Sequence, residues 1–211
     1  GVADVVGYYE NQIIVKQVQY CRPSVVEKVS YYENKEAVRI ETDSNCDGHL
    51  DEIDLLVGGA VTDRFKDSDK DGKVETWLKF TGEKVGLSEE DTNNDGRTDL
   101  RMIYSYGAPL RQEADYNFDG QPDVWAYFKN GKKARQEEDQ NYDGTIDVRY
   151  EYGAGEQLVS EEPVENVKPL AEMLARFSLI KESFGKTRAT ASRGEKRESF
   201  FSKYFSWIRF W

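Results

Sequence analysis

The chain has 211 residues, 38% of them hydrophobic and 13% aromatic, and its formal net charge at pH 7 is −11. An acidic chain argues against nucleic acid as the main partner, because phosphate contacts need a basic surface, and it favours bound cations. No apolar run reaches the roughly 18 residues of a membrane-spanning helix. The two cysteines and the single histidine do not form a zinc-binding pattern.

Residues 1–42 contain degenerate copies of a hairpin repeat. The segment "EKVSYYENKEAVRIET" at 27–42 aligns with "DVWAYFKNGKKARQEE" at 123–138. The loop before it, "QYCRPSVVE", carries only one acid, and "GYYENQ" at 7–12 is a further trace of the same unit. Together with the intact copies that follow, this region predicts six or seven β-hairpins in a row.

Residues 43–162 contain five intact copies, each opening on an acidic stretch of nine residues such as "DYNFDGQPD" at 115–123. The copies begin at 43, 67, 91, 115 and 139, a constant step of 24 residues. Oxygen-bearing side chains occupy positions 1, 3, 5 and 9 of each copy, and glycine occupies position 6. Such a constant period predicts a repeat array in which each unit contacts mainly its neighbours.

The stretch after each acidic loop alternates between polar and apolar residues, which indicates a β-strand. Val124, Ala126 and Phe128 share one face, and the Asn130-Gly131 pair that follows is a strong hairpin signal. We therefore expect a mainly β fold, an elongated array of 24-residue β-hairpin repeats stapled by calcium loops, with a C-terminal α-helical extension.

The apolar residues of the first intact copy, Ile53, Leu55 and Val57, alternate one residue out of step with the other copies. This displacement predicts a β-bulge in that copy.

The pattern changes after Glu162, where Pro163 replaces the first acid of the next loop. We expect a helix over 163–185, a linker over 186–198 and an amphipathic, basic and aromatic helix over 199–211. The last helix would contact a protein complex or a membrane surface through the aromatic and aliphatic residues of one face: Phe200, Tyr204, Trp207, Ile208 and Trp211.

The acidic loops predict metal binding, because oxygens at positions 1, 3, 5 and 9 of a tight loop converge on one point. Six or seven hard oxygen ligands suit Ca²⁺ better than Mg²⁺, which prefers strict octahedra and keeps its waters. A solvated Asp/Asn turn would explain one copy, but not five at a constant period. Up to five Ca²⁺ ions are expected, and the predicted ligands are Asp43, Asn45, Asp47 and Asp51; Asp67, Asp69, Asp71 and Glu75; Asp91, Asn93, Asp95 and Asp99; Asp115, Asn117, Asp119 and Asp123; and Asp139, Asn141, Asp143 and Asp147.

The loops resemble the D-x-D/N-x-D-G-x-x-D hairpin loops of integrin-α, FG-GAP and VCBS repeats, and this resemblance implies calcium between two strands. They also resemble the first half of an EF-hand loop, but the glutamate of position 12 is absent, and only Asp54 is acidic there. The hairpins, as in "WAYFKNGK", resemble MORN-type repeats. Helix-loop-helix units are therefore not expected.

An enzymatic function is not expected, because no nucleophile motif or phosphate-binding glycine loop is present. His49 lies at loop position 7, where the backbone carbonyl rather than the side chain serves as a ligand. Trp77 and Trp125 are interpreted as packing residues rather than a sugar-binding platform.

Cys21 and Cys46 lie in consecutive loops, which stacking would bring side by side, so a disulfide is predicted in place of two free thiols. The expected function is a calcium-binding scaffold subunit outside the cytoplasm (periplasmic, cell-surface or secreted) that docks through its C-terminal helices. The alternative is a carbohydrate- or surface-binding adhesion module.

Overall fold

A computed structural model of the chain describes residues 5–169. These residues form one 14-stranded β-sheet. They contain no helix, and so none that is long and apolar enough to cross a membrane. The strands are β1 (Val5–Glu10), β2 (Ile13–Arg22), β3 (Val25–Glu33), β4 (Glu36–Thr42), β5 (Glu52–Val57), β6 (Ala60–Lys66), β7 (Thr76–Thr81), β8 (Lys84–Glu90), β9 (Leu100–Ser105), β10 (Ala108–Ala114), β11 (Val124–Lys129), β12 (Lys132–Glu138), β13 (Ile146–Tyr152) and β14 (Leu158–Val167).

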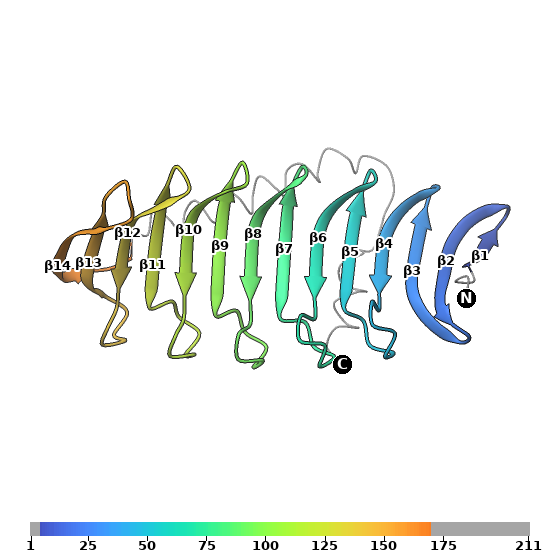
Figure 1. Ribbon diagram of the computed structural model, residues 1–211, viewed down its shortest axis with the longest axis horizontal. Coiled ribbons are helices and arrows are strands. Elements are labelled where there is room, and N and C mark those ends of the chain that lie inside the picture. The colour runs from blue at the N-terminus through green and yellow to red at the C-terminus, as the bar shows by residue number, and fades with distance from the viewer. Residues whose placement is uncertain (1–4, 170–211) are drawn as a thin grey trace, which may run out of the picture.

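Each strand pairs antiparallel with its neighbour in the sequence, so the sheet is a simple meander from β1 to β14. Figure 1 shows the resulting long, narrow molecule, in which successive hairpins lie side by side. The predicted mainly β hairpin array is confirmed at this level. Residues 170–185 of the helix predicted over 163–185, the linker of residues 186–198 and the aromatic helix of residues 199–211 lie outside the described residues.

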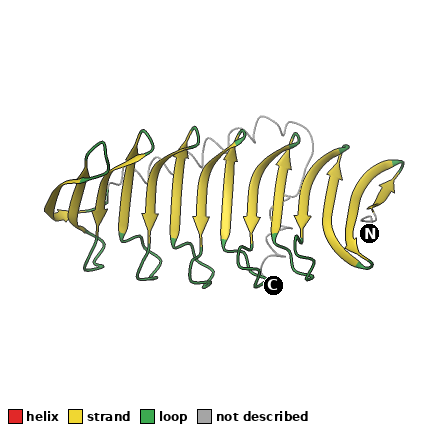
Figure 2. Cartoon of the chain, in the orientation of Figure 1, coloured by secondary structure: helices red, strands yellow, loops and turns green. Residues whose placement is uncertain are grey.

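The two long edges of the sheet differ. Tight hairpin turns lie along one edge, and the long acidic loops lie along the other (Figure 2). At the Asn130-Gly131 turn both residues have positive φ, 55° and 76°, as a type I′ turn requires. The asparagine-glycine signal was therefore sufficient to predict this turn.

The alternation predicted from the sequence places one row of side chains on a common face. Leu78, Met102, Ala126 and Tyr150 come from β7, β9, β11 and β13, and small or amide side chains of the strands between them complete the row. Trp125, on the opposite face, is only 4% exposed, which confirms it as a packing residue. Trp77 stacks on Phe65 with 6.2 Å between ring centroids. The core is therefore distributed along the sheet.

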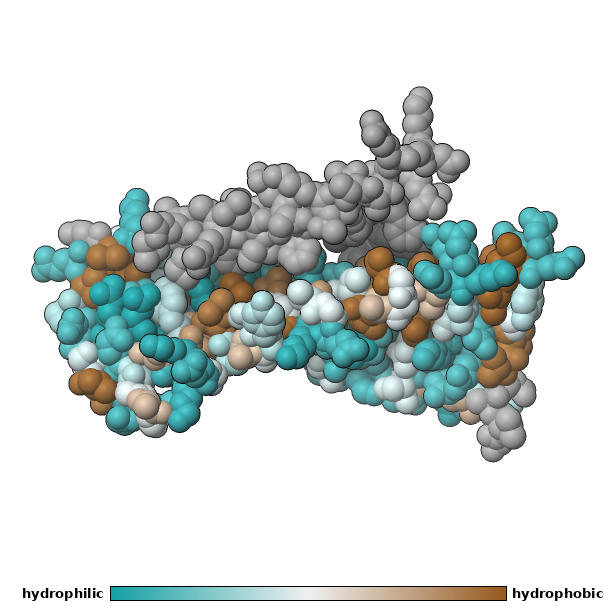
Figure 3. Space-filling view, turned by 90° about the horizontal axis from the view of Figure 1, so that it is seen from above, coloured by the Kyte–Doolittle hydropathy of each residue, from teal (hydrophilic) through white to brown (hydrophobic). Residues whose placement is uncertain are grey.

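Charged side chains also join the strands on the face that carries Trp125. Arg101 on β9 bridges Glu89 on β8 and Glu113 on β10, with nitrogen-oxygen distances of 2.6 and 3.2 Å. Arg149 on β13 pairs with Glu137 on β12 at 2.8 Å. At the edge of tight turns, hydrophobic side chains are visible only in small separate groups among hydrophilic ones (Figure 3).

The bulge predicted for the first intact copy is wrong as a feature of that copy alone. Ile53 pairs with Phe65 as Trp125 pairs with Glu137, and both hairpins shift register at the equivalent place near the turn. Strand β5 therefore has the same register as β11. Asp54 occupies in β5 the position that Ala126 occupies in β11, and it has a charged partner there. Arg64 grips both carboxylate oxygens of Asp54, at 2.7 and 2.9 Å, which compensates for the burial of that acid.

The sheet also continues past the point where the sequence suggests that it stops. Pro163 pairs with Val148 within β14, which extends to Val167, so a helix cannot begin at residue 163. Proline is tolerated here because β14 is an edge strand with a register irregularity against β13.

Candidate metal centres

Five acidic loops stand in a row along one edge of the sheet (Figure 1): the first loop (43–51), the second (67–75), the third (91–99), the fourth (115–123) and the fifth (139–147). Backbone hydrogen bonds connect each loop to the one before it. The N–H of Asp67, for example, donates to the carbonyl of Asp51 at 2.9 Å, and that of Asp91 to the carbonyl of Glu75 at 2.8 Å. Neighbouring loops are therefore held in a fixed relative position.

The aspartate at position 1 organises each turn. Asp67 accepts the N–H of Gly72 at 2.8 Å with one oxygen and the N–H of Asp71 at 3.2 Å with the other. Asp115, its counterpart in the fourth loop, is 4% exposed and likewise accepts the glycine N–H, that of Gly120, at 2.7 Å. The glycine has positive φ in every loop, 92° at Gly72, which a side chain would oppose.

Positions 3 and 5 use one oxygen each to hold the loop. In the second loop, Asp69 accepts the N–H of Asp71 at 3.1 Å, and Asp71 accepts the N–H of Lys73 at 2.9 Å. His49 occupies position 7 of the first loop, and its N–H donates to Asp47 in the same way, at 2.8 Å. In the first, third and fourth loops the second oxygen of the acid at position 5 also accepts the side-chain amide N–H of the asparagine at position 3, at 2.7 to 3.3 Å.

The acid at position 9 closes the loop and provides the clearest indication of a ligand. One oxygen of Glu75 accepts the N–H of Ser68 at 2.7 Å, and one oxygen of Asp99 accepts that of Thr92 at 2.7 Å. The other oxygen is buried and has no hydrogen-bond partner in three of the loops, at Asp51 Oδ1, Glu75 Oε1 and Asp99 Oδ1. A buried carboxylate oxygen without a partner is costly unless a cation binds it.

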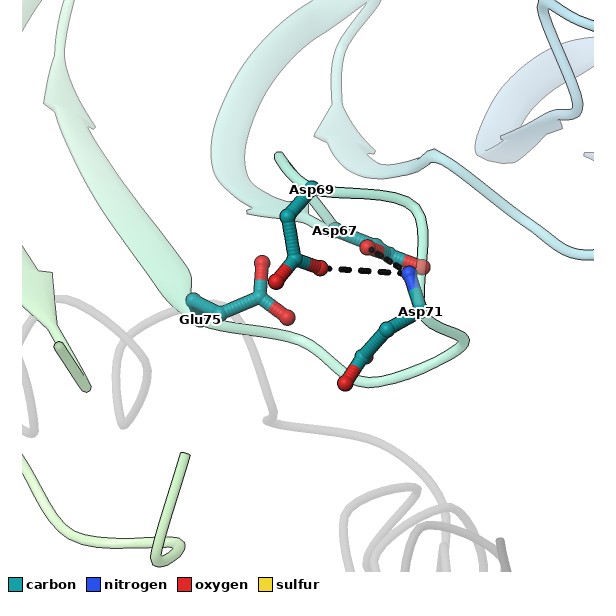
Figure 4. A group of neighbouring side chains, drawn as sticks. All are labelled: Asp67, Asp69, Asp71 and Glu75. Atoms are coloured by element: carbon teal, nitrogen blue, oxygen red, sulfur yellow. Dashed lines mark hydrogen bonds between the residues drawn. The ribbon is translucent and has the colours of Figure 1, made fainter. Parts of the chain in front are cut away.

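Two loops bring their acids together closely enough to hold a metal ion. In the second loop, ligand oxygens of Asp67, Asp69, Asp71 and Glu75 lie within 4.8 Å of one another. Figure 4 shows Glu75, the residue just before β7, directed toward the three aspartates. In the third loop, Asp91, Asp95 and Asp99 converge in the same way. Within residues 5–169, no other group of three acidic, cysteine or histidine side chains does so.

The pKa shifts of the loop acids reflect the same arrangement. Burial raises the pKa of Glu75, and the charges of Asp67 and Asp69 raise it further. Burial also raises the pKa of Asp123, with contributions from Asp115 and Asp119. These acids favour a proton, or a cation in its place, over an unscreened charge.

Asp51 shows the opposite shift. Burial disfavours its charged form, but hydrogen bonds from the hydroxyl and the N–H of Ser44, together with the ammonium group of Lys70, lower its pKa overall. Hydrogen-bond donors of the first loop and a positive charge from the second loop therefore already balance this acid.

The four predicted ligands of each loop lie together in that loop, but the loops differ in how closely the acids converge. Cys21 and Cys46 form a disulfide, and Arg22 donates to the carbonyl of Cys46 at 2.8 Å. Asp54, the acid at position 12, is paired with Arg64 and is not directed into a loop. The predicted partner-binding residues Phe200, Tyr204, Trp207, Ile208 and Trp211 lie outside the described residues.

Two contributors to these sites were not predicted from the sequence. The backbone N–H at position 2 holds the acid at position 9, and Lys70 at position 4 of the second loop reaches into the first. The constant length of nine residues in every acidic stretch was a usable signal for the first contact. No sequence pattern indicates the second, because it depends on how neighbouring loops are placed.

No protein-family model and no curated protein matches this chain. Among solved structures, one similar chain is a TarM mutant from S. aureus in complex with Fondaparinux, alpha-GlcNAc-glycerol and UDP, which is 11% identical with a TM-score of 0.18. That match covers 70% of this chain and 21% of the other, so this chain spans about a fifth of the matched protein. A TM-score this low supports no inference about function.

Proposed function

We propose that this chain is a non-enzymatic, calcium-binding structural protein outside the cytoplasm. The observation that carries the proposal is the second loop, where the buried, unpaired Oε1 of Glu75 belongs to a group of four carboxylates within 4.8 Å. A cation at this point would receive only oxygen ligands. Carboxylate, amide and backbone oxygens in a flexible loop favour Ca²⁺ over the transition metals and over Mg²⁺.

Calcium would stiffen a sheet that has little other support. The described residues form a single sheet, and the five acidic loops lie along one edge, where their acids repel one another without a counter-ion. A bound ion would connect the start of each loop, which follows one strand, to position 9, which precedes the next strand. Binding free energy would then contribute directly to folding.

Two features support a location outside the cytoplasm. The Cys21–Cys46 disulfide fits an oxidising compartment. Loops of this kind in extracellular modules bind calcium with dissociation constants of about 10⁻⁴ to 10⁻³ M, which needs the calcium levels found outside cells.

The direct test is a calcium titration of the full chain by isothermal calorimetry, with melting temperature measured in calcium and in excess chelator. We expect binding to several sites and a fall in melting temperature of many degrees on chelation. Asp71→Asn should weaken binding, whereas Glu36→Gln removes an exposed acid at the turn edge and should not. An identical melting curve in calcium and in chelator contradicts the proposal.

The scaffold role rests on the C-terminal residues, for which the sequence predicts docking to a protein complex or a membrane surface. Deletion of residues 170–211 leaves every described strand intact and should abolish co-purification with the partner while calcium binding persists. A deletion variant that keeps its partner would place the docking surface on the sheet instead.

A carbohydrate-binding adhesion module is the second candidate, and one observation favours it. A hollow of about 400 Å³ beside the tight turns is lined by Lys84, Val85, Tyr104, Tyr106 and Gly107. Tyr106 is 92% exposed there and could stack on a sugar ring. Loss of binding to a glycan array in Tyr106→Ser, with calcium binding unchanged, would support this candidate over the scaffold.

A further inference from the structure

The second acidic loop reaches into the first through a single lysine. Lys70, at position 4 of the second loop, places its Nζ 3.2 Å from Oδ2 of Asp51 and 3.1 Å from Oγ of Ser44. Asp51 is the acid at position 9 of the first loop, and its side chain is only 9% exposed. An ammonium group therefore lies against one of the predicted metal ligands of the neighbouring loop.

The first and third loops form a matched pair within one molecule. Their predicted ligands are the same residue types in the same order, Asp, Asn, Asp and Asp. Both keep a buried oxygen without a hydrogen-bond partner at position 9, Asp51 Oδ1 and Asp99 Oδ1. Residue type at the ligand positions therefore gives no reason for the two loops to bind a cation differently.

Their surroundings differ. The residue equivalent to Lys70 beside the third loop is Phe118, which carries no charge. The acids of the third loop converge within 4.8 Å, whereas those of the first loop are not among the converging groups of the described residues. The carboxylate next to the lysine thus belongs to one of the three loops, the first, the fourth and the fifth, whose acids are not among the converging groups.

We propose that Lys70 is an internal counter-cation of the first loop, which therefore binds calcium more weakly than the third loop despite identical ligands. This inference rests on the proposed calcium binding. A divalent ion bound through Asp51 would lie close to the ammonium group, and the two positive charges would repel each other. As calcium rises, the third loop fills before the first, and the first fills only as Lys70 leaves Asp51.

Nuclear magnetic resonance can follow each loop separately in the full chain. The N–H of Gly48 donates to Asp43 at 2.8 Å and that of Gly96 to Asp91 at 2.7 Å, so these two amides report on the first and third loops. We expect the calcium midpoint at Gly48 to exceed that at Gly96 by on the order of tenfold at low salt, with a smaller difference at high salt.

Three variants test the effect of the ammonium charge at this position. Lys70→Met keeps an unbranched side chain of similar length without the ammonium group and should lower the midpoint at Gly48 several-fold while that at Gly96 stays within about twofold. Lys70→Arg keeps the charge and should leave the first loop weak. Asn94→Lys places a lysine at the equivalent position beside the second loop, at a similar φ of 60°, and should raise the midpoint at Gly72.

The possible results separate this inference from the proposed function. If Gly96 responds to calcium but Lys70→Met leaves the midpoint at Gly48 unchanged, Lys70 does not control the first loop and calcium binding stands. If the wild-type midpoints at Gly48 and Gly96 are equal, the first loop does not bind calcium more weakly than the third, and the inference is wrong. If no loop glycine responds up to about 10 mM calcium, well above the range of extracellular modules, both fail.

Discussion

At the scale of single residues, Glu75 is a predicted metal ligand whose ionised side chain destabilises the metal-free fold. Burial and the charges of Asp67 and Asp69 raise its pKa, so the metal-free folded state binds a proton more readily than the unfolded chain does. Stability contributed through Glu75 therefore increases as pH falls through the raised value toward that of an ordinary glutamate, and it is lost as pH rises. Calcium would replace the proton at neutral pH.

The effect of Glu75→Gln on the melting temperature should consequently have opposite signs without and with calcium. In chelator at pH 7 we expect a higher melting temperature than wild type, and the difference should shrink as pH falls below the raised pKa. In saturating calcium the variant should melt lower, because a ligand is lost. Thermal denaturation in chelator and in calcium tests this prediction. A variant that melts lower than wild type in both conditions would contradict the prediction that Glu75 needs a bound cation.

At the scale of secondary-structure elements, the β5–β6 hairpin has an ion pair where the next hairpin has a leucine and a serine. Asp54 is 8% exposed, and the Arg64 side chain that grips it is 30% exposed. The equivalent positions of the next hairpin are Leu78 and Ser88, which pair directly across β7 and β8. The same backbone register thus accepts either solution, provided that both partners change together.

This hairpin gives a double-mutant prediction. Asp54→Leu alone leaves the charge of Arg64 without its main partner and should destabilise the protein by about 1–3 kcal/mol. Adding Arg64→Ser reproduces the Leu78–Ser88 pair and should restore most of the loss. Chemical denaturation of the three variants measures the coupling, and simple additivity would show that the ion pair does not hold this register.

The fourth loop tests how far a local change spreads along the sheet. Asp119 accepts the backbone N–H of Gln121 at 2.8 Å and lies in a loop joined by backbone hydrogen bonds to the third and fifth loops. Asp119→Ala should raise hydrogen exchange in the third to fifth loops and leave the first loop near wild type. Gln121→Ala in the same loop is the control. Uniform loss of protection over 43–162 would instead indicate one cooperative unit.

At the scale of the whole molecule, the disulfide joins two kinds of repeat. Residues 5–42 lack an acidic loop of their own, and Cys21 ties them to Cys46 in the first acidic loop. Closing the intervening segment of roughly 24 residues stabilises the fold by on the order of 3 kcal/mol in the loop-entropy description.

Replacing both cysteines by serine should therefore destabilise mainly the N-terminal hairpins. We expect faster hydrogen exchange in residues 5–42, with calcium midpoints at Gly96 and Gly120 unchanged. Non-reducing mass spectrometry of the wild type provides the control, since it should show no alkylatable thiol. Loss of calcium binding in the third and fourth loops would mean that the sheet unfolds as one unit.

The sequence by itself determined the five intact repeats, their strands, the tight turns and the loop positions, because the alternation and the turn residues recur in each 24-residue unit. A spacing of two fixes which face a side chain occupies, and an Asn-Gly pair fixes its own turn. Only the tertiary structure decided which units contact each other and how. The Lys70–Asp51 contact, the compensation of Asp54 by Arg64 and the place of Pro163 in an edge strand depend on neighbouring strands and loops. Local pattern does not encode these contacts, because a side chain that crosses between units is indistinguishable in sequence from one that points into solvent.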